Sequence, residues 1–537
     1  MNLALAFAGA LFLSVTLLPV LMRNAARWGL MDDPAEARKI HTELKPRIGG
    51  IGIVAATFLS AGYWLAADAL PAGLVAGAVV IVAFGYLDDR YTLRVRWKFL
   101  GQVLAVLLLL AGGVTIDHVP LLGLEVAPAW IRYPLSFFFV LGVINAVNMS
   151  DGLDGLAAGM VLMSIGTLAA LAVMTGQDAA AVAALAVAGG VLGFLRYNTF
   201  PSRTFMGDTG SQFLGFAVAA LAILVTQHPG AAVSPALPLL IAGLPVIDTL
   251  SVMALRIIRG KSPFLPDAKH LHHQFLQIGC RHHEAVAVLY LLQLALLALA
   301  WWSRYESDGF ILALYLVFCA TLLGAVLLMR LRDFRLRRHR DELPQAERRN
   351  VVLRRFGWVH RQAAQVLAAG VAVMLLAVAL LVERPVPGLG QFPLSCAAAC
   401  ALLWLVFRER PIFVTRALVY MASALTVYAL LRGGDRPAFN LVIDASLIAL
   451  VAFLFLAIRM TRREVFRPDT QDGLVLLMIV MIPLLPAGEI AELELGRIAL
   501  RSAALVYCCE YILSCAPHAR HLLLNAAAVG GMVVLGV

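Results

Sequence analysis

The residues best suited to chemistry are carboxylates and amides that gather in a few short polar segments. The segment 145–159, NAVNMSDGLDGLAAG, contributes Asn145, Asn148, Asp151 and Asp154. Their spacing of three residues places the four side chains near one face while the segment stays helical. The glycines of DGLDG are expected to break that helix and let backbone N–H groups approach a ligand. An Asx-type turn with capping residues is the alternative.

Two more segments add acids at the ends of apolar runs. Asp88 and Asp89 are adjacent, and adjacent carboxylates repel unless a cation or metal lies nearby. In the segment 197–216, GDTGS can begin a helix capped by Asp208 or Thr209, and a helix N-terminus favours phosphate. Solvated acids at a helix end and simple capping are the respective alternatives.

Two basic segments could bind phosphate groups. The segment 261–275 carries an H-x-H-H pattern made of His270, His272 and His273. Zinc is the weaker interpretation, because no carboxylate or cysteine nearby in the sequence completes a tetrahedral set. Lys45 and Arg47 precede Gly49 in the segment 32–50, where ordinary positive-inside charge is the alternative.

Taken together, these segments supply acids for a divalent metal, Mg²⁺ or Mn²⁺, and cations for phosphates. Phosphoryl transfer depends on positioning and charge neutralisation, which these residue types provide. We therefore expect two substrates, a soluble nucleotide-activated donor and a lipid phosphate acceptor.

The elements that position these residues are expected to be membrane-spanning helices. Of the 537 residues, 61% are hydrophobic and only 14% are charged. Apolar runs recur along the chain, and the length needed to cross a bilayer gives about eighteen candidate spans. The sequence thus predicts an all-α polytopic membrane protein. Its seven cysteines show no CxxC spacing, which argues against a disulfide framework.

Charge in the loops predicts the sidedness of the chain. Basic loops alternate with short, nearly uncharged ones; the basic loops are residues 23–47, 88–98, 196–208, 256–283 and 330–361. The positive-inside rule places them, and with them every candidate site, in the cytoplasm. It also explains the net charge of +10 without a nucleic-acid partner. The first run is interpreted as a span with its N-terminus outside, with a cleaved signal peptide as the alternative.

The sequence predicts three regions. Residues 1–335 hold all the motifs and about eleven spans. Residues 336–361 form a basic cytoplasmic linker, and residues 362–537 form an additional membrane domain with about seven spans. A transporter or flippase is the main rival interpretation, especially for this last region. It predicts ionisable residues in the middle of the spans, and the spans of the core lack them. A CDP-alcohol phosphotransferase would need a D-G-x-x-A-R signature that DGLDGLAAG lacks.

The ordered segments resemble the motifs of the polyprenyl-phosphate N-acetylhexosamine-1-phosphate transferase superfamily, glycosyltransferase family 4, over about residues 1–335. The resemblance is stronger to the branch that makes undecaprenyl-diphosphate-GlcNAc for O-antigen, enterobacterial common antigen or teichoic acid linkage. The phospho-MurNAc-pentapeptide transferases usually carry a PTMGG-type stretch where this chain has PRIGG. The resemblance implies an eleven-span core with its N-terminus outside, in the bacterial inner membrane.

The resemblance also implies roles for individual residues. Asp208 and Asn148 correspond to metal ligands, and Asp88 and Asp89 to the acids near the lipid phosphate. Asp151 and Asp154 correspond to the nucleotide-side acids. The residues implied to bind substrate are Asn198, Phe205, His270, His272, His273, Lys45 and Arg47.

The implied reaction is attack of undecaprenyl phosphate on the β-phosphorus of a UDP-N-acetylhexosamine, with release of UMP. GlcNAc is the default sugar, while GalNAc, QuiNAc and FucNAc remain open. A direct transfer is favoured over a two-step route through an aspartyl-phosphate. The expected partners are these two substrates and the bilayer, and a homodimer is left open.

Overall fold

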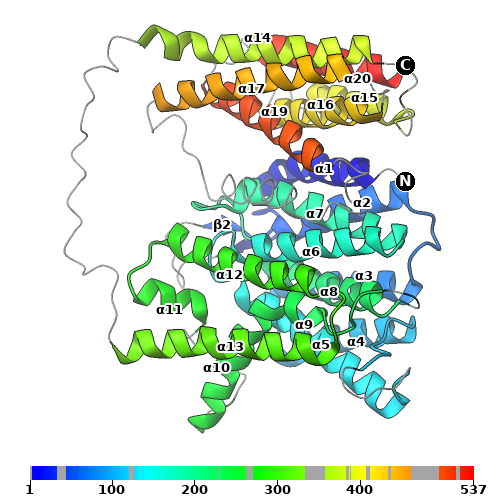
Figure 1. Ribbon diagram of the computed structural model, residues 1–537, viewed down its shortest axis with the longest axis vertical. Helices are drawn as coiled ribbons and strands as arrows, with labels where there is room; N and C mark the ends of the chain where they lie inside the picture. Colours follow the sequence, from blue (N-terminus) through cyan, green and yellow to red (C-terminus); the bar gives the residue numbers. More distant parts are fainter. Residues whose placement is uncertain are drawn as a thin grey trace. The chain divides into compact units, whose positions relative to one another are not determined.

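The computed structural model describes most of the chain (Figure 1). The described residues are 3–32, 44–119, 126–228, 230, 232–260, 262, 270–332, 357–382, 386, 389–406, 412–432, 437–460, 495–515 and 521–537. The chain divides into two compact units, Val20–Leu343 and a second unit made of Met1–Pro19 with Pro344–Val537. Each unit is described by itself.

The first unit is built almost entirely of helices, and the predicted all-α class is confirmed. Its helices are α1 (Leu3–Asn24), whose first part belongs to the second unit, α2 (Gly49–Trp64), α3 (Ala72–Tyr91), α4 (Val95–Ala111), α5 (Ala129–Ser150), α6 (Leu156–Met174), α7 (Asp178–Asn198), α8 (Gly207–Thr226), α9 (Pro238–Ile241), α10 (Gly243–Ile258), α11 (Leu271–Gln277), α12 (His282–Trp302) and α13 (Asp308–Leu331). One small antiparallel sheet pairs β1 (Met31–Asp32) with β2 (Lys45–Pro46).

Nine helices are long and apolar enough to cross a membrane within the part of the chain that the structure describes. Six shorter apolar helices accompany them. Since unpaired backbone groups are costly in hydrocarbon, runs of this composition fold as helices. The chain is therefore a multi-pass membrane protein, while the expected total of about eighteen spans remains a prediction because residues 461–494 lie outside the described ranges.

Helix α8 is the central element of the first unit. It packs against α2, α3, α5 and α6, and 94% of its most apolar 18-residue window is buried inside the structure. The residues on every side of α8 are therefore in contact with protein. A helix buried all round is apolar all round, which agrees with the sequence of this segment after its polar first turn.

The N-terminal turn of α8 is approached closely by two other helices, at glycines. A Cβ added to Gly85 on α3 would lie 2.6 Å from Cα of Thr209 and 2.9 Å from the carbonyl oxygen of Asp208. Gly50 at the start of α2 lies against the backbone of Gly210 in the same way. The lack of side chains at these positions lets the backbones meet, as at other tightly packed helix pairs in membranes.

The second unit is a bundle of apolar helices. They are α14 (Gly357–Leu381), α15 (Phe392–Val406), α16 (Ile412–Arg432), α17 (Pro437–Met460), α19 (Leu495–Cys515) and α20 (His521–Gly536). Helix α14 packs against α17, α19 and α20, and α16 packs against α19 and α20.

Ion pairs join helices of the second unit, which the sequence analysis did not predict. Arg501 on α19 forms two hydrogen bonds with Asp444 on α17, at 2.7 and 2.9 Å. Glu510 on α19 accepts hydrogen bonds from Arg416 at 2.9 Å and from Tyr420 at 2.5 Å, both on α16. Pairing of this kind is what allows charged side chains to sit inside an apolar bundle.

Gly85→Ala should destabilise the first unit. The added methyl group has no room between α3 and the start of α8, and overpacking of this kind costs about 1–3 kcal/mol. We expect a lower midpoint of thermal unfolding in detergent. The matched control is Gly62→Ala on α2, where an added Cβ meets no atom within 4 Å and better helix propensity adds up to about 1 kcal/mol. Equal midpoints for the two variants would contradict the close approach.

Candidate active site

Four helices bring their ends together at one polar cluster. Asp88 lies in the last turn of α3, Lys98 in the first turn of α4, Asn148 in the last turn of α5 and Asp208 in the first turn of α8. The ammonium group of Lys98 pairs with Oδ2 of Asp88 at 3.2 Å and also with the carboxylate of Asp208. Nδ2 of Asn148 donates to Oδ1 of Asp208 at 2.6 Å. Residues up to 120 positions apart in the sequence thus share one site.

Asp89 holds the N-terminus of α8 in place. Its Oδ1 accepts the backbone N–H of Asp208 at 2.7 Å, and its Oδ2 accepts the N–H of Thr209 at 2.9 Å and the hydroxyl of Thr209 at 2.5 Å. The first N–H groups of a helix have no partner within the helix, and a negative charge there is favoured by the helix dipole. The expected cap at Asp208 or Thr209 is wrong, because α8 has no side-chain cap of its own and Asp89 of α3 supplies the acceptor.

Asp88 performs a second task at the end of α3. Its Oδ1 accepts the backbone N–H of Leu93 at 2.8 Å, just after Thr92 turns the chain with a positive φ of 49°. Residues other than glycine seldom adopt this conformation. The same carboxylate that pairs with Lys98 therefore also directs the chain from α3 into α4.

A layer of amides lies one helical turn below this cluster. Gln102 on α4 follows Lys98 by four residues, Gln212 on α8 follows Asp208 by four, and Asn145 on α5 precedes Asn148 by three. The side chain of Gln102 donates to Gln212 at 3.2 Å and accepts from Asn145 at 3.0 Å. Buried amides bonded to one another fix the relative register of the helices that carry them.

The DGLDG segment breaks the helix as predicted. Helix α5 ends at Ser150 and α6 begins at Leu156, with Gly155 between them at a φ of 80°. Burial, and after it the charges of Asp208, Asp154 and Asp89, raises the pKa of Asp151 to about 7. Asp151 is thus close enough to the acids of the cluster to feel their charge.

Asp154 and Asn198 tie the DGLDG segment to the loop before α8. Oδ2 of Asp154 accepts the N–H of Ser202 at 3.0 Å. Oδ1 of Asn198 accepts the N–H of Gly155 at 2.9 Å, while its Nδ2 donates to the carbonyl of Thr204 at 2.9 Å. With its oxygen and nitrogen both bonded to the backbone, Asn198 acts here as a clamp between two loops.

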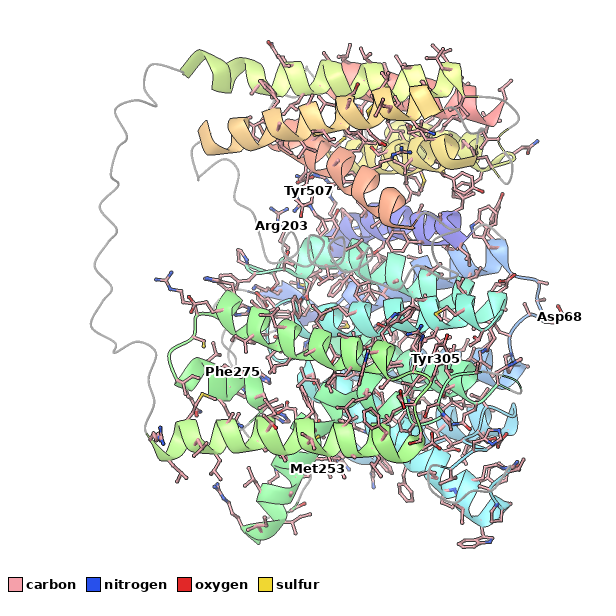
Figure 2. The ribbon with its side chains drawn as sticks, in the orientation of Figure 1. Asp68, Arg203, Met253, Phe275, Tyr305 and Tyr507 are labelled. Atoms are coloured by element: carbon pink, nitrogen blue, oxygen red, sulfur yellow. The ribbon has the colours of Figure 1, made fainter. Side chains whose placement is uncertain are left out.

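Lys45, Phe205 and Arg47 lie along the same loop and its neighbouring sheet. Nζ of Lys45 donates to the hydroxyl of Ser202 at 3.0 Å and lies 5.2 Å from the centre of the Phe205 ring. Arg47 pairs with Asp32 across β1 and β2. Figure 2 labels Arg203, an exposed residue of this loop. Lys45 and Phe205 are therefore brought together, whereas Arg47 is bound to the acid of the opposite strand.

The three histidines form a stack beside the DGLDG segment. The rings of His270 and His272 are nearly parallel, with centres 5.8 Å apart, and His272 and His273 are 4.2 Å apart. Nε2 of His272 lies directly against Gly152, where an added Cβ would collide with it. Burial lowers the pKa of His272 to about 3, followed by the effects of His273 and His270. His272 is therefore neutral at physiological pH.

Two residues of the site were missed by the sequence analysis. Lys98 lies in the same segment as Asp88, ten residues later, and its place at the start of the next helix was the available signal. Asp248 on α10 lies 3.0 Å from Nδ1 of His270. It lies 22 residues before the histidines in an apolar run, and no signal in the sequence connects the two.

Comparison with known proteins identifies the family to which the chain belongs. The model of glycosyl transferase family 4 matches residues 71–226. A probable undecaprenyl-phosphate N-acetylglucosaminyl 1-phosphate transferase from Bacillus subtilis is 34% identical over 297 residues, which cover 54% of this chain and 82% of that protein. The chain belongs to glycosyl transferase family 4.

Other members of glycosyl transferase family 4 match over a similar length. The undecaprenyl-phosphate alpha-N-acetylglucosaminyl 1-phosphate transferase of Escherichia coli K12 is 31% identical over 57% of this chain and 87% of its own. The decaprenyl-phosphate N-acetylglucosaminephosphotransferase of Mycobacterium tuberculosis H37Rv is 34% identical over 50% and 74%. The family model spans the segments that carry Asp88, Asn148 and Asp208.

Asp89→Ala should lower both stability and activity. The substitution leaves the N–H groups of Asp208 and Thr209 without their buried acceptor, which costs about 1–3 kcal/mol for each unsatisfied group. Thermal unfolding of the purified protein measures the loss. Asp68→Ala, in the exposed turn between α2 and α3 that Figure 2 labels, is the control with no expected effect. An unchanged midpoint for Asp89→Ala would contradict the capping role.

Asp151 should make the metal-free protein less stable as the pH rises. Its pKa in the folded protein, about 7, is above the ordinary value of 3.8, so the folded state holds a proton that the unfolded state has lost. Stability contributed by this proton is present below pH 4 and is lost as the pH rises through 7, by up to about 4 kcal/mol. In a buffer that contains a metal chelator, the midpoint temperature of unfolding of the wild type should decrease as the pH is raised from 5 to 8.

The variant Asp151→Asn tests the assignment of this pH dependence. An amide does not titrate in this range, so the midpoint of the variant should fall less steeply and exceed that of the wild type at pH 8. Parallel curves for the two proteins would mean that another group is responsible.

Proposed function

We propose that this protein transfers GlcNAc-1-phosphate from UDP-GlcNAc to undecaprenyl phosphate, releasing UMP. The observation that carries the proposal is the meeting of Asp88, Lys98, Asn148 and Asp208 from four helix ends, within the segments that the family model matches. The activities for which the relatives from B. subtilis and E. coli are named support the transfer of GlcNAc-1-phosphate to undecaprenyl phosphate.

In the proposed reaction, an oxygen of the lipid phosphate attacks the β-phosphorus of the donor. The bond from the β-phosphorus to the bridging oxygen breaks, and that oxygen leaves with UMP. Lys98 is suited to bind phosphate oxygens, because its ammonium group has three N–H donors and already lies between two anionic groups. Asp88 is suited to orient the acceptor from the opposite side of Lys98.

The donor set at the cluster suits Mg²⁺ or Mn²⁺. These ions prefer oxygen ligands and are held by one or two carboxylates together with substrate phosphates. Asp208 and Asn148 would hold the ion, with Asp88 on the other side of Lys98. In the described ranges, no three His, Cys, Asp or Glu side chains form a group arranged to hold a metal. The bound ion would supply charge neutralisation for the phosphates.

We infer that the site opens to the cytoplasm from the inner membrane of a bacterium. The motifs lie at helix ends beside the basic loops 88–98, 196–208 and 256–283, and such loops remain on the cytoplasmic side. A soluble nucleotide sugar and a lipid head group could meet at this boundary. The product would be the lipid-linked first sugar of a cell-surface polysaccharide.

Asp208→Asn should abolish transfer while leaving the protein folded. The amide keeps the shape and can still bond Lys98 or Asn148 poorly, but it removes the charge that would hold the metal. The assay combines purified protein, undecaprenyl phosphate, Mg²⁺ and labelled UDP-GlcNAc, and counts butanol-extractable sugar lipid. UDP-GalNAc in a parallel tube tests the sugar.

The control for this assay is Asp178→Asn, at the far end of α7, which should behave as the wild type. Normal turnover by Asp208→Asn would contradict the assignment of Asp208 as a metal ligand. Absence of sugar lipid with wild-type protein for every UDP-sugar would remove the proposed activity.

A further inference from the structure

Asp248 is a buried carboxylate whose two oxygens both have hydrogen-bond partners. It has no role in the reaction described so far. It lies on α10 and is 5% exposed. Its Oδ2 lies 3.0 Å from Nδ1 of His270, and its Oδ1 accepts the backbone N–H of Leu271 at 2.7 Å. One side chain therefore holds both the first histidine of the motif and the first residue of α11.

The position of Asp248 on α10 shows that it faces the interior. The buried residues Asp248, Val252 and Arg256 follow one another at intervals of four, which places them on one face of the helix. A buried carboxylate costs free energy unless it is hydrogen-bonded. The contacts with His270 and Leu271 meet that requirement across two elements far apart in the sequence. Figure 2 marks the two helices by Met253 on α10 and Phe275 on α11.

The histidines connect Asp248 to the nucleotide side of the site. The rings of His270 and His272 lie within 7° of parallel, and Nε2 of His272 lies against Gly152 of the DGLDG segment. A chain of contacts thus runs from Asp248 through the histidine rings to the loop that carries Asp151 and Asp154.

The chemistry of the pair decides which nitrogen of His270 carries the proton. An ionised carboxylate has acceptors only, so Nδ1 must donate to Asp248, and Nε2 is the ring nitrogen left for a ligand. With a proton on each ring nitrogen, the ring would donate from Nδ1 to Asp248 and from Nε2 to an oxygen of a bound anionic phosphate. The imidazolium would then lie between two anions, with a charge-assisted hydrogen bond on each side, and such bonds are about twice as strong as neutral ones.

We propose that Asp248 is a positioning residue of the transferase: by holding Nδ1 of His270 and the start of α11, it presents Nε2 of His270 to the diphosphate of the donor. This inference rests on the proposed function. Asp248 itself touches no substrate in this arrangement and acts through His270.

Asp248→Asn tests the proposal because it keeps the shape of the side chain. The amide oxygen can still accept from Leu271, but the amide nitrogen now donates to Nδ1 and moves the proton of His270 to Nε2. Replacing the carboxylate partner of a metal-binding histidine typically costs 10–100-fold, and we expect a fall of similar size, about 10–100-fold, in kcat/KM here. Asp117→Asn removes the charge of a half-buried acid that pairs with Arg132; it is the control and should retain wild-type kcat/KM.

A double-mutant cycle separates positioning from a general structural role. If Asp248 acts through His270, the loss caused by Asp248→Asn should largely disappear in a His270→Gln background. Losses that multiply, or wild-type kcat/KM in Asp248→Asn, would overturn the inference. Because the wild type is measured in the same assay, failure of the proposed function appears separately, as an inactive wild type.

Nitrogen-15 NMR of histidine-labelled protein gives a readout that does not depend on activity. In the ligand-free wild type, the His270 signal, assigned by its disappearance in His270→Gln, should show the proton on Nδ1. In Asp248→Asn it should show the proton on Nε2. A wild-type His270 with its proton on Nε2 would overturn the proposal on its own.

Discussion

The capture of the α8 N-terminus by Asp89 is the interaction on which the site depends. One carboxylate on α3 accepts two backbone N–H groups and a hydroxyl from the first turn of α8, which sets where Asp208 lies. Lys98 and Asn148 can then reach Asp208 from α4 and α5. Asp88 and Asp89 are neighbours in the sequence, yet Asp88 pairs with Lys98 and Asp89 binds the first turn of α8.

Close backbone approach makes this capture geometrically feasible. Gly85 allows α3 to touch Thr209, and Gly50 allows α2 to touch Gly210. The N–H groups of Gly49 and Gly50 donate to the carbonyls of Phe205 and Met206 at 3.0 and 2.8 Å, which secures the loop just before α8. Packing of small residues replaces the hydrophobic effect as the force between helices in lipid, and here it serves the site as well as the fold.

The site combines several carboxylates with one ammonium group. Asp88 and Asp208 pair with Lys98, and the raised pKa of Asp151 reflects burial and the charges of nearby acids. This arrangement supports the proposal that the site receives a divalent cation together with phosphates. The neutral His272 and the anchored His270 give the opposite side of the site donors and acceptors of fixed orientation.

The membrane class, the helical fold and the candidate segments could all be predicted from the amino-acid sequence, because the hydropathy of a segment and the charge of a loop are local properties that govern insertion into the bilayer. Asp88, Asn148, Asp151 and Asp208 were all identifiable as polar residues at the ends of apolar runs. Their resemblance to a family supplied the roles that spacing alone left open.

The contacts that those residues make became visible only once the helices were packed together. The tertiary structure assigned Asp89 to a helix cap, Asn198 to a clamp between loops and Arg47 to a pair with Asp32, and it brought Lys98 and Asp248 into the site. Such roles depend on partners that lie from 15 to 120 residues away in the sequence, and side-chain contacts at that range are set by helix packing rather than by any local pattern.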